Sequence, residues 1–192
     1  MARTYTLKKR AESQAETRRR IVEAAIELHC AVGPAQTTFS MVAERAGVQR
    51  HTLYAHFPDE QSLLLECSGL YSEREPLPDP APWRGIEDWR ERLRTGLPAL
   101  YGWYERNARL AANVLRDAEQ DPQVREIVTL RWGPTMAAYR DVLGDELSTA
   151  QRAMLHLALS FFTWRTLVLE SGLKPEGAVE AMVQAVDCAR KT

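Results

Sequence analysis

The chain has few cysteines: Cys30, Cys67 and Cys188, which lie far apart. An odd and widely spaced set matches neither a disulfide framework nor the close spacing of a metal site. Each cysteine falls on an expected helix, so we expect all three to be small buried apolar residues. This usage favours a reducing compartment.

The sequence also lacks a long apolar segment and an N-terminal signal region. Its longest charge-free apolar-rich run, Ala153–Trp164, is shorter than the roughly 20 residues that cross a bilayer. The first residues are basic rather than apolar, so they do not resemble a signal peptide. We therefore expect a cytoplasmic protein with no membrane partner.

Familiar catalytic patterns are missing as well. The chain contains no H-E-x-x-H, no G-x-S-x-G and no Gly-rich phosphate loop. The four histidines are scattered, and His156, on an apolar stretch, fits a hydrogen-bonded core residue better than a base or a ligand. We expect no enzyme activity, no catalytic residue, no metal site and no cofactor.

The charge of the chain is unevenly distributed. The overall charge of −1 argues by itself against nucleic acid as a partner. However, residues 1–56 carry nine Lys or Arg against five Glu, whereas the remainder carries 16 basic against 21 acidic side chains. This asymmetry indicates that the N-terminal part contacts a polyanion.

The segment Thr37–Phe57, TTFSMVAERAGVQRHTLYAHF, predicts two short helices joined by a tight turn. Thr38 is a good N-cap residue for the first of them. Gly47 suits the end of that helix, because only glycine takes positive φ without strain. The second helix should run from Gln49 to His56 and end before the following proline. Helix, glycine turn and helix together form the helix-turn-helix pattern.

The second helix of this segment has a face without carboxylates. Leu53 and Phe57 lie four residues apart, so both can face inward. The side chains left for the other faces all donate hydrogen bonds: Arg50, His51, Thr52, Tyr54 and His56. Such donors suit phosphates and base edges, so we expect this helix to bind DNA. The alternatives are a core role for Tyr54 and a helix C-terminal cation for His56.

The residues before this segment are basic. Residues 1–12 are expected to form a flexible basic arm, which is either simply solvated or follows DNA into the minor groove. Ser13 and Glu16 have capping-box spacing and should open the first long helix. One side chain of Arg18–Arg20 can contact a phosphate there.

Several features of residues 13–66 match a known family: the Thr before the second helix, the A-E-R-A-G-V turn, T-L-Y-x-H-F, and a fourth helix after Pro58. The region resembles the N-terminal DNA-binding domain of the TetR (tetracycline-repressor-like) family. The resemblance implies an all-α fold, with a three-helix helix-turn-helix DNA-binding domain at 13–58. A larger helical ligand-binding and dimerisation domain would follow at 59–192.

The resemblance also implies a set of DNA-contacting residues. They are Thr38, Gln49, Arg50, His51, Thr52, Tyr54 and His56. Thr38 would cap its helix and touch a phosphate, and residues 50–52 would face the major groove. Tyr54 and His56 would hold the DNA backbone.

Three residues depart from the family pattern. His51 stands where the family often has a small residue. Gln49 replaces a common capping Ser and is a poor cap. Glu60 falls where the family usually has a phosphate-binding Lys, so that contact is expected to be missing.

The rest of the chain predicts further helices. Asp59 should cap a fourth helix that runs to Arg74 and links the DNA-binding domain to the remainder. The proline-rich segment 76–82 cannot be helical. Later helices are expected at 86–107, 108–120, 122–143, 148–171 and from 175 onward, with a kink or break at Pro98 and a kink at Gly133-Pro134.

Three further expectations concern the larger domain. The helix at 148–171 is apolar on nearly every side, so it must be covered all round. The resemblance favours a homodimer through the last two helices. A small-molecule effector would sit among aromatic and neighbouring residues, which otherwise simply pack the core: Trp103, Tyr104, Trp132, Met136, Tyr139, Phe162 and Arg165.

Together these expectations describe a DNA-binding transcriptional regulator, a repressor released from a palindromic double-stranded operator by an unknown small-molecule effector. Its two recognition helices would lie about 34 Å apart or a multiple of that. The effector would act on DNA binding through the fourth helix. The alternatives are a sequence-unspecific DNA-binding protein without a ligand, and a helical enzyme with a vestigial DNA domain.

Overall fold

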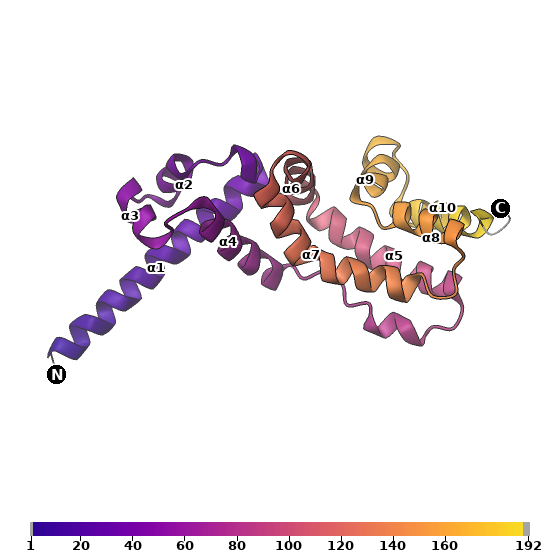
Figure 1. The fold of residues 1–192 in the computed structure, drawn as a ribbon, viewed down its shortest axis with the longest axis horizontal. Helices are drawn as coiled ribbons and strands as arrows, with labels where there is room; N and C mark the ends of the chain where they lie inside the picture. The colour runs from indigo at the N-terminus through magenta and orange to yellow at the C-terminus, as the bar shows by residue number, and fades with distance from the viewer. Residues whose placement is uncertain (1, 190–192) are drawn as a thin grey trace. The chain divides into compact units, whose positions relative to one another are not determined.

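The computed structural model describes residues 2–189, with side chains from residue 9 onward, and in this range it contains helices and no strands (Figure 1). The predicted all-α fold is thereby confirmed. The α-helices are α1 (Ala2–Ala31), α2 (Phe39–Ala46), α3 (Arg50–His56), α4 (Glu60–Arg74), α5 (Trp89–Arg106), α6 (Ala108–Gln120), α7 (Pro122–Leu143), α8 (Thr149–Ala158), α9 (Phe161–Trp164) and α10 (Pro175–Cys188). Across the described residues the order also includes two 3-10 helices, η1 (Pro34–Gln36) and η2 (Ala81–Gly85), and a π-helix, η3 (Arg165–Glu170).

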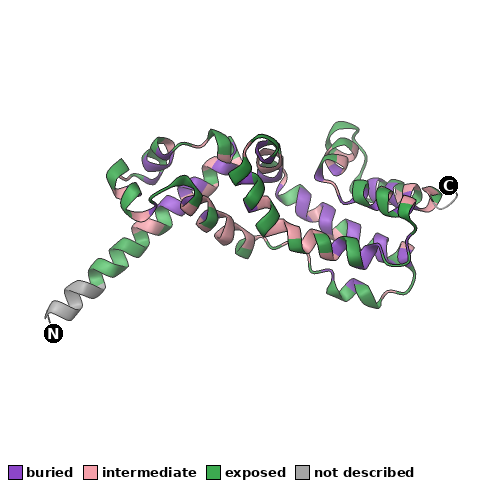
Figure 2. Ribbon diagram, viewed as in Figure 1, coloured by how far each residue is buried: buried purple, intermediate pink, exposed green. Residues whose placement is uncertain are grey.

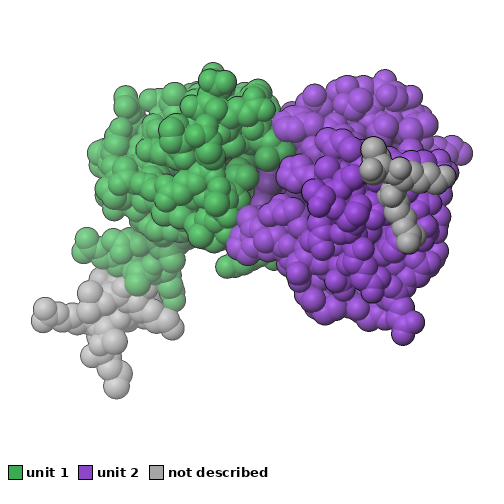
Figure 3. Space-filling view, turned by 45° about the vertical axis from the view of Figure 1, so that its right-hand side comes forward, with its two compact units in different colours: residues 1–76, 112–131 green, residues 77–111, 132–192 purple. Residues whose placement is uncertain are grey.

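The chain divides into two compact units, which Figure 3 colours separately. Unit 1 comprises residues 1–76 and 112–131, and unit 2 comprises residues 77–111 and 132–192. Helices α6 and α7 therefore each have one end in unit 1 and the other end in unit 2, whereas α4 belongs wholly to unit 1. The functional domain boundary expected after residue 58 stays a prediction. None of the described helices is both long and apolar enough to cross a membrane.

Unit 1 is built around the buried face of α1. This helix packs against α2 and α4, and α2 packs against α3. Figure 2 marks the buried residues of these helices in purple. The core cluster consists of Ile21, Val22, Ala24, Ala25, Phe39, Val42, Ala43, Ala46, Leu53, Phe57, Leu63 and Cys67. Because α1 buries residues at helical spacing, it forms a platform on which the helix-turn-helix is fixed.

In unit 2, α5 packs against α10, α9 and η2, and α8 packs against α10. Pro98 lies inside α5 and Pro134 inside α7, and both helices continue through their prolines. The break considered at Pro98 is therefore absent. The apolar face of α10 is buried within its own protomer, at Ala178, Val179, Met182, Val183 and Val186.

The start of α1 differs from the prediction. The helix already includes Ala2, so Ser13 lies inside it and does not open it. The carbonyl of Ser13 accepts a hydrogen bond from the Thr17 hydroxyl at 2.9 Å, as in an ordinary helical turn. The backbone of residues 2–12 is helical, in place of the flexible arm expected from the sequence.

The prediction of one helix from Ser148 to Ser171 is wrong. The capping box at its start is confirmed, because the Ser148 hydroxyl accepts from the Gln151 N–H and the Gln151 side chain accepts from the Ser148 N–H. However, α8 ends at Ala158, and Ser160 begins a new turn by accepting from the Phe162 N–H at 3.2 Å. The chain then passes from α9 into η3.

This region is also more exposed than predicted. Leu157 is 47% exposed and Leu169 is 58% exposed, so the segment is not covered on all sides within one protomer. His156 is exposed rather than part of the core. Among the cysteines, Cys67 is buried as expected, but Cys30 is half-buried and Cys188 is exposed.

Candidate nucleic-acid interface

The turn of the helix-turn-helix forms as its residues dictate. The Thr38 hydroxyl accepts from the Met41 N–H at 3.3 Å and caps α2. Gly47 ends α2 with φ 64° and ψ 40°, a left-handed conformation that strains any residue with a side chain. Val48, the residue after this turn, is half-buried and packs against the core cluster. The predicted Thr38 cap and Gly47 turn are confirmed, and the phosphate contact of Thr38 stays a prediction.

Helix α3 has one buried side and one open side. Leu53 and Phe57 are both fully buried, as predicted. Arg50 and His51 are exposed, whereas Thr52 and His56 are half-buried. Because α3 contains no acidic residue, its open side presents donors without a carboxylate to compete for them. Such a surface can receive phosphate oxygens and base edges.

Gln49 and Tyr54 lie at the border of this surface. Gln49 precedes α3 and makes no side-chain capping bond, which confirms that it is a poor cap. The ring of Tyr54 packs against Phe39 with centroids 5.2 Å apart, while the residue stays 47% exposed. Packing fixes the ring and leaves part of it open, so the alternative of a wholly buried core tyrosine does not hold.

A surface hollow beside Tyr54 is acidic. It is lined by Phe39, Tyr54, Asp59, Glu60, Gln61 and Gln123. Asp59 caps α4 by accepting from the Ser62 N–H at 2.7 Å, as predicted. Glu60 follows it as the first residue of α4 and is exposed. This anionic side chain lines the same hollow as Tyr54, and the absence of a phosphate contact at Glu60 stays a prediction.

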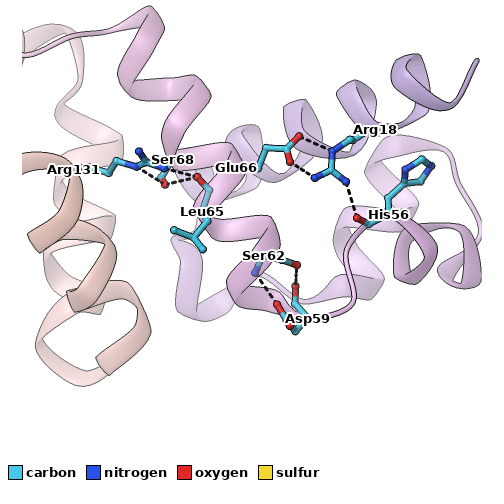
Figure 4. Close-up of polar contacts among 8 residues, drawn as sticks. All are labelled: Arg18, His56, Asp59, Ser62, Leu65, Glu66, Ser68 and Arg131. Carbon is cyan, nitrogen blue, oxygen red and sulfur yellow. Dashed lines mark hydrogen bonds and ion pairs between the residues drawn. The ribbon is translucent and has the colours of Figure 1, made fainter. Parts of the chain in front are cut away.

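The arginines of α1 lie in different environments. Arg18 donates to Glu66 and to the carbonyl of His56 (Figure 4). Arg19 pairs with Glu16 on the surface at 2.9 Å. Arg20 is exposed, and no ion pair described in the structure involves it. The phosphate contact expected from one of these three arginines stays a prediction.

The end of α1 is held by α6 within unit 1. Asn113 donates to the carbonyls of His29 and Cys30, at 3.3 Å and 2.9 Å. Arg116 donates to the carbonyl of Val32 at 2.9 Å. These carbonyls lie at the end of α1, where the helix supplies few donors of its own. The sequence analysis missed these contacts, because their partners lie more than 80 residues apart in the chain.

The turn after α1 also depends on α6. Gly33 has φ 100° and lies against Asp117, so that a Cβ at this position would collide with the carboxylate. The same carboxylate accepts from the Ala35 N–H at 3.0 Å. The start of η1 is therefore fixed by a buried acid on another helix.

The predicted effector residues fall into separate groups in unit 2. Trp103 and Tyr104 are buried and lie in contact, and Trp132 meets Trp103 edge-on at 5.5 Å. Tyr139 lies elsewhere: it stacks on Trp83 at 5.5 Å and its hydroxyl donates to the Pro78 carbonyl at 2.6 Å.

The other predicted effector residues are more open. Met136 is half-buried and Phe162 is exposed. Arg165 pairs with Glu170 at 3.0 Å and lies over the Phe162 ring at 5.2 Å. The charge on this apolar segment therefore already has a partner within the chain. Among the residues that the structure describes, no group of three or more His, Cys, Asp or Glu could hold a metal.

The sequence analysis missed Tyr101 and the role of Tyr104. Their hydroxyls donate to the carbonyls of Ala158 and Leu159, at 3.0 Å and 2.6 Å. Those carbonyls lose their usual helical donors because α8 ends there. Burial raises the pKa of both phenols, so each remains a hydrogen-bond donor at neutral pH.

An acid-free helix, presented by a glycine turn on a three-helix platform, defines a helix-turn-helix DNA-binding protein. Comparison with known proteins agrees with this class. Residues 21–67 match the family described as bacterial regulatory proteins, tetR family. The chain is 38% identical over 96 residues to the HTH-type transcriptional regulator SrpR of Pseudomonas putida, a match covering 49% of this chain and 44% of SrpR.

A second relative, also from Pseudomonas putida, is the uncharacterized HTH-type transcriptional regulator TtgW. It is 38% identical over 96 residues, and the match covers 49% of this chain and 70% of TtgW. The chain belongs to the TetR family of bacterial regulatory proteins, and its N-terminal part forms the helix-turn-helix of that family. The match spans less than half the length of SrpR.

Solved structures resemble the whole chain in fold. A TetR-like transcriptional regulator from Rhodococcus sp. RHA1 has a TM-score of 0.62 at 18% identity, covering 91% of this chain and 96% of that one. A TetR family transcription regulator from Marinobacter aquaeolei VT8 has a TM-score of 0.58 at 18% identity, covering 91% and 97%. At these identities the likeness establishes the fold alone.

Proposed function

We propose that this regulator is a homodimeric repressor that binds a palindromic operator through α3 and leaves it when a small molecule binds unit 2. The observation that carries the proposal is the open side of α3. It holds exposed Arg50 and His51 and no acid, while Leu53 and Phe57 fix the opposite side in the core. Regulation of transcription makes the cytoplasm the proposed location.

The proposed DNA contacts follow from exposure. Arg50 and His51 are the residues of α3 most open to a major groove, with half-buried Thr52 beside them. Tyr54 is held by Phe39 and offers its hydroxyl to the DNA backbone. The remaining proposed contacts, whose side chains are exposed or half-buried, are Thr38, Gln49 and His56.

The effector site is proposed among the aromatic residues of unit 2. Trp103, Tyr104 and Trp132 form a contiguous group there. Aromatic walls with few polar groups are typical of small-molecule pockets. This effector site predicts that a compound which releases the protein from the operator also raises the melting temperature of the protein. Release from the operator without thermal stabilisation contradicts an effector site in unit 2.

Arg50→Ala tests the role of α3. Operators are first selected from random DNA with the full-length protein, and affinities are then measured by fluorescence anisotropy over a range of salt. A base contact from Arg50 predicts that the variant loses about 1–3 kcal/mol and tolerates changes at one operator position. The matched control is Arg109→Ala, which removes an exposed arginine in unit 2 and should leave affinity unchanged.

The same assay separates a regulator from an unspecific DNA-binding protein. A regulator prefers its operator over random DNA by about 10³ or more, whereas an unspecific binder shows salt-dependent binding with little preference. If selection enriches no sequence, or if Arg50→Ala binds as tightly as the unmodified protein, the proposed interface is wrong.

A further inference from the structure

Arg18 lies at the junction of α1, α3 and α4, with its guanidinium turned toward the end of α3 (Figure 4). Its Nε donates to Glu66 Oε1 at 2.9 Å, and a second guanidinium nitrogen pairs with Glu66 Oε2. The third nitrogen donates to the His56 carbonyl at 2.7 Å. The guanidinium carbon also lies 4.1 Å above the centre of the Phe57 ring. Every nitrogen of the Arg18 guanidinium thus has a partner inside the protein.

The carbonyl that Arg18 contacts belongs to the last residue of α3. A helix leaves its final carbonyls without intrahelical donors, and its C-terminal end favours a positive charge. After His56 the chain turns away, because Phe57 has φ −135° and ψ 103°. Arg18 supplies the missing donor to the His56 carbonyl and also covers the ring of Phe57, so it holds the C-terminal end of α3 against α1.

Glu66 is itself held on a fixed turn of α4. On that turn, Arg131 of α7 donates to the Leu65 carbonyl at 2.8 Å and to the Ser68 hydroxyl at 3.2 Å (Figure 4). Gly69 leaves room for the Arg131 side chain, because a Cβ at this position would lie 3.0 Å from the Arg131 guanidinium. Glu66 therefore orients Arg18 from a turn that is held by α7.

We propose that Arg18 is a positioning residue for DNA binding, and that Arg18 and Glu66 together set the angle at which the open side of α3 meets the groove. The inference rests on the proposed function, in which α3 reads the operator. It assigns Arg18 a role through α3, and not the phosphate contact that an arginine of α1 can otherwise make.

The two roles predict opposite effects at Glu66. If Arg18 contacted a phosphate, Glu66 would compete for its charge, and Glu66→Gln would strengthen DNA binding. If Arg18 positions α3, Glu66→Gln releases Arg18 and weakens binding. A phosphate contact also adds to the salt dependence, so its loss lowers the slope of log affinity against log salt by about 0.9, whereas loss of a positioning residue leaves the slope unchanged.

The experiment measures operator affinity of the full-length protein across a salt series for Arg18→Gln, Arg18→Lys, Glu66→Gln and Arg74→Gln. Arg74 is the matched control, because it also joins α4 to α1, through Glu23 at 2.8 Å, without touching α3. Arg18→Gln should weaken binding by roughly tenfold, as expected for loss of a charged hydrogen bond. Arg18→Lys should restore little of the affinity, because an ammonium group cannot donate to Glu66 and to the His56 carbonyl in the geometry of a guanidinium. Arg74→Gln should bind normally.

Amide hydrogen exchange gives a second readout that needs no DNA. The Phe57 N–H donates to the Leu53 carbonyl at 2.8 Å, so it reports on the end of α3. It should exchange faster in Arg18→Gln and Glu66→Gln, and unchanged in Arg74→Gln. Tighter binding of Glu66→Gln, a lower salt slope in Arg18→Gln, or unchanged exchange at Phe57 overturns the inference. Failure of the unmodified protein to bind any DNA overturns the proposed function, while exchange still decides whether Arg18 and Glu66 hold the end of α3.

Discussion

At the scale of single residues, a buried imidazole makes the stability of unit 1 depend on pH. His29 is 8% exposed, and its Nδ1 lies 3.5 Å from the Cys67 sulfur. Burial lowers the pKa of His29 from 6.5 to about 4, although the Asp117 carboxylate acts in the opposite direction. Burial likewise raises the pKa of the Cys67 thiol to about 12, so both partners are neutral at pH 7.

The depressed pKa of His29 predicts a loss of stability in mild acid. Between pH 6.5 and about 4 the unfolded state binds a proton at His29 and the folded state does not, so the free energy of unfolding falls as pH falls. The loss approaches about 3 kcal/mol at the lower end, and none of it occurs above pH 7. Urea unfolding at pH 7, 5.5 and 4.5 measures it.

The control for this prediction is His29→Gln, which removes the titrating group and keeps a polar side chain. The variant should be less stable at pH 7, but its stability should change less between pH 7 and 4.5 than that of the unmodified protein. Parallel pH profiles for the two proteins would show that other groups cause the acid sensitivity.

Residues with near neighbours as partners were predictable from the sequence. Thr38, Asp59 and Ser148 each bond to an N–H three residues later, so a short pattern contains both partners. Arg18 was not predictable in this way, since Glu66 and His56 lie 48 and 38 positions away. The local pattern showed only three successive arginines, and the fold decides which of them faces inward.

At the scale of elements, the break between α8 and α9 shows how distant side chains override local periodicity. Residues 148–171 are apolar enough for one continuous helix, yet the helix stops at Ala158. The two carbonyls released there receive phenolic donors from α5, at positions 57 and 55 residues away. Ser160, a good N-cap residue, then starts α9. Of these causes of the break, only the N-cap residue Ser160 could be recognised from the local sequence.

Tyr104→Phe tests whether these phenols stabilise the break. The change leaves the ring contacts with Phe161 and Trp164 in place but removes the donor to the buried Leu159 carbonyl. An unsatisfied buried acceptor costs about 1–3 kcal/mol. We expect a loss of that size in urea unfolding. Tyr54→Phe, which alters a ring that is 47% exposed, is the control and should change stability by less than about 0.5 kcal/mol.

A smaller loss in Tyr104→Phe than in the control would mean that the Leu159 carbonyl needs no phenolic donor. The Tyr101 hydroxyl still donates to the Ala158 carbonyl in this variant, so the measurement isolates the contribution of the Tyr104 hydroxyl.

At the scale of the whole molecule, the proposed homodimer needs an apolar surface that one protomer does not use. The family resemblance favoured the last two helices as this surface. The buried residues of α10 cannot do so, because α10 packs against α5 and α8 of its own protomer. The exposed side of α8 is a better candidate, since Ala153 and Leu157 lie four residues apart and are both exposed.

Leu157→Glu tests this surface in full-length protein. Because Leu157 is 47% exposed, the charge should leave the fold of one protomer intact, as judged by circular dichroism. In a dimer the carboxylate would be desolvated without a partner, at several kcal/mol per ion, so the dissociation constant should rise by roughly a hundredfold or more. Sedimentation across a concentration series measures this. Operator affinity should also fall, because the two α3 helices are no longer held at one spacing.

His156→Glu is the control. It places the same charge one residue earlier, about 100° around the helix, and should remain dimeric. A dimeric Leu157→Glu would place the interface elsewhere on the protein.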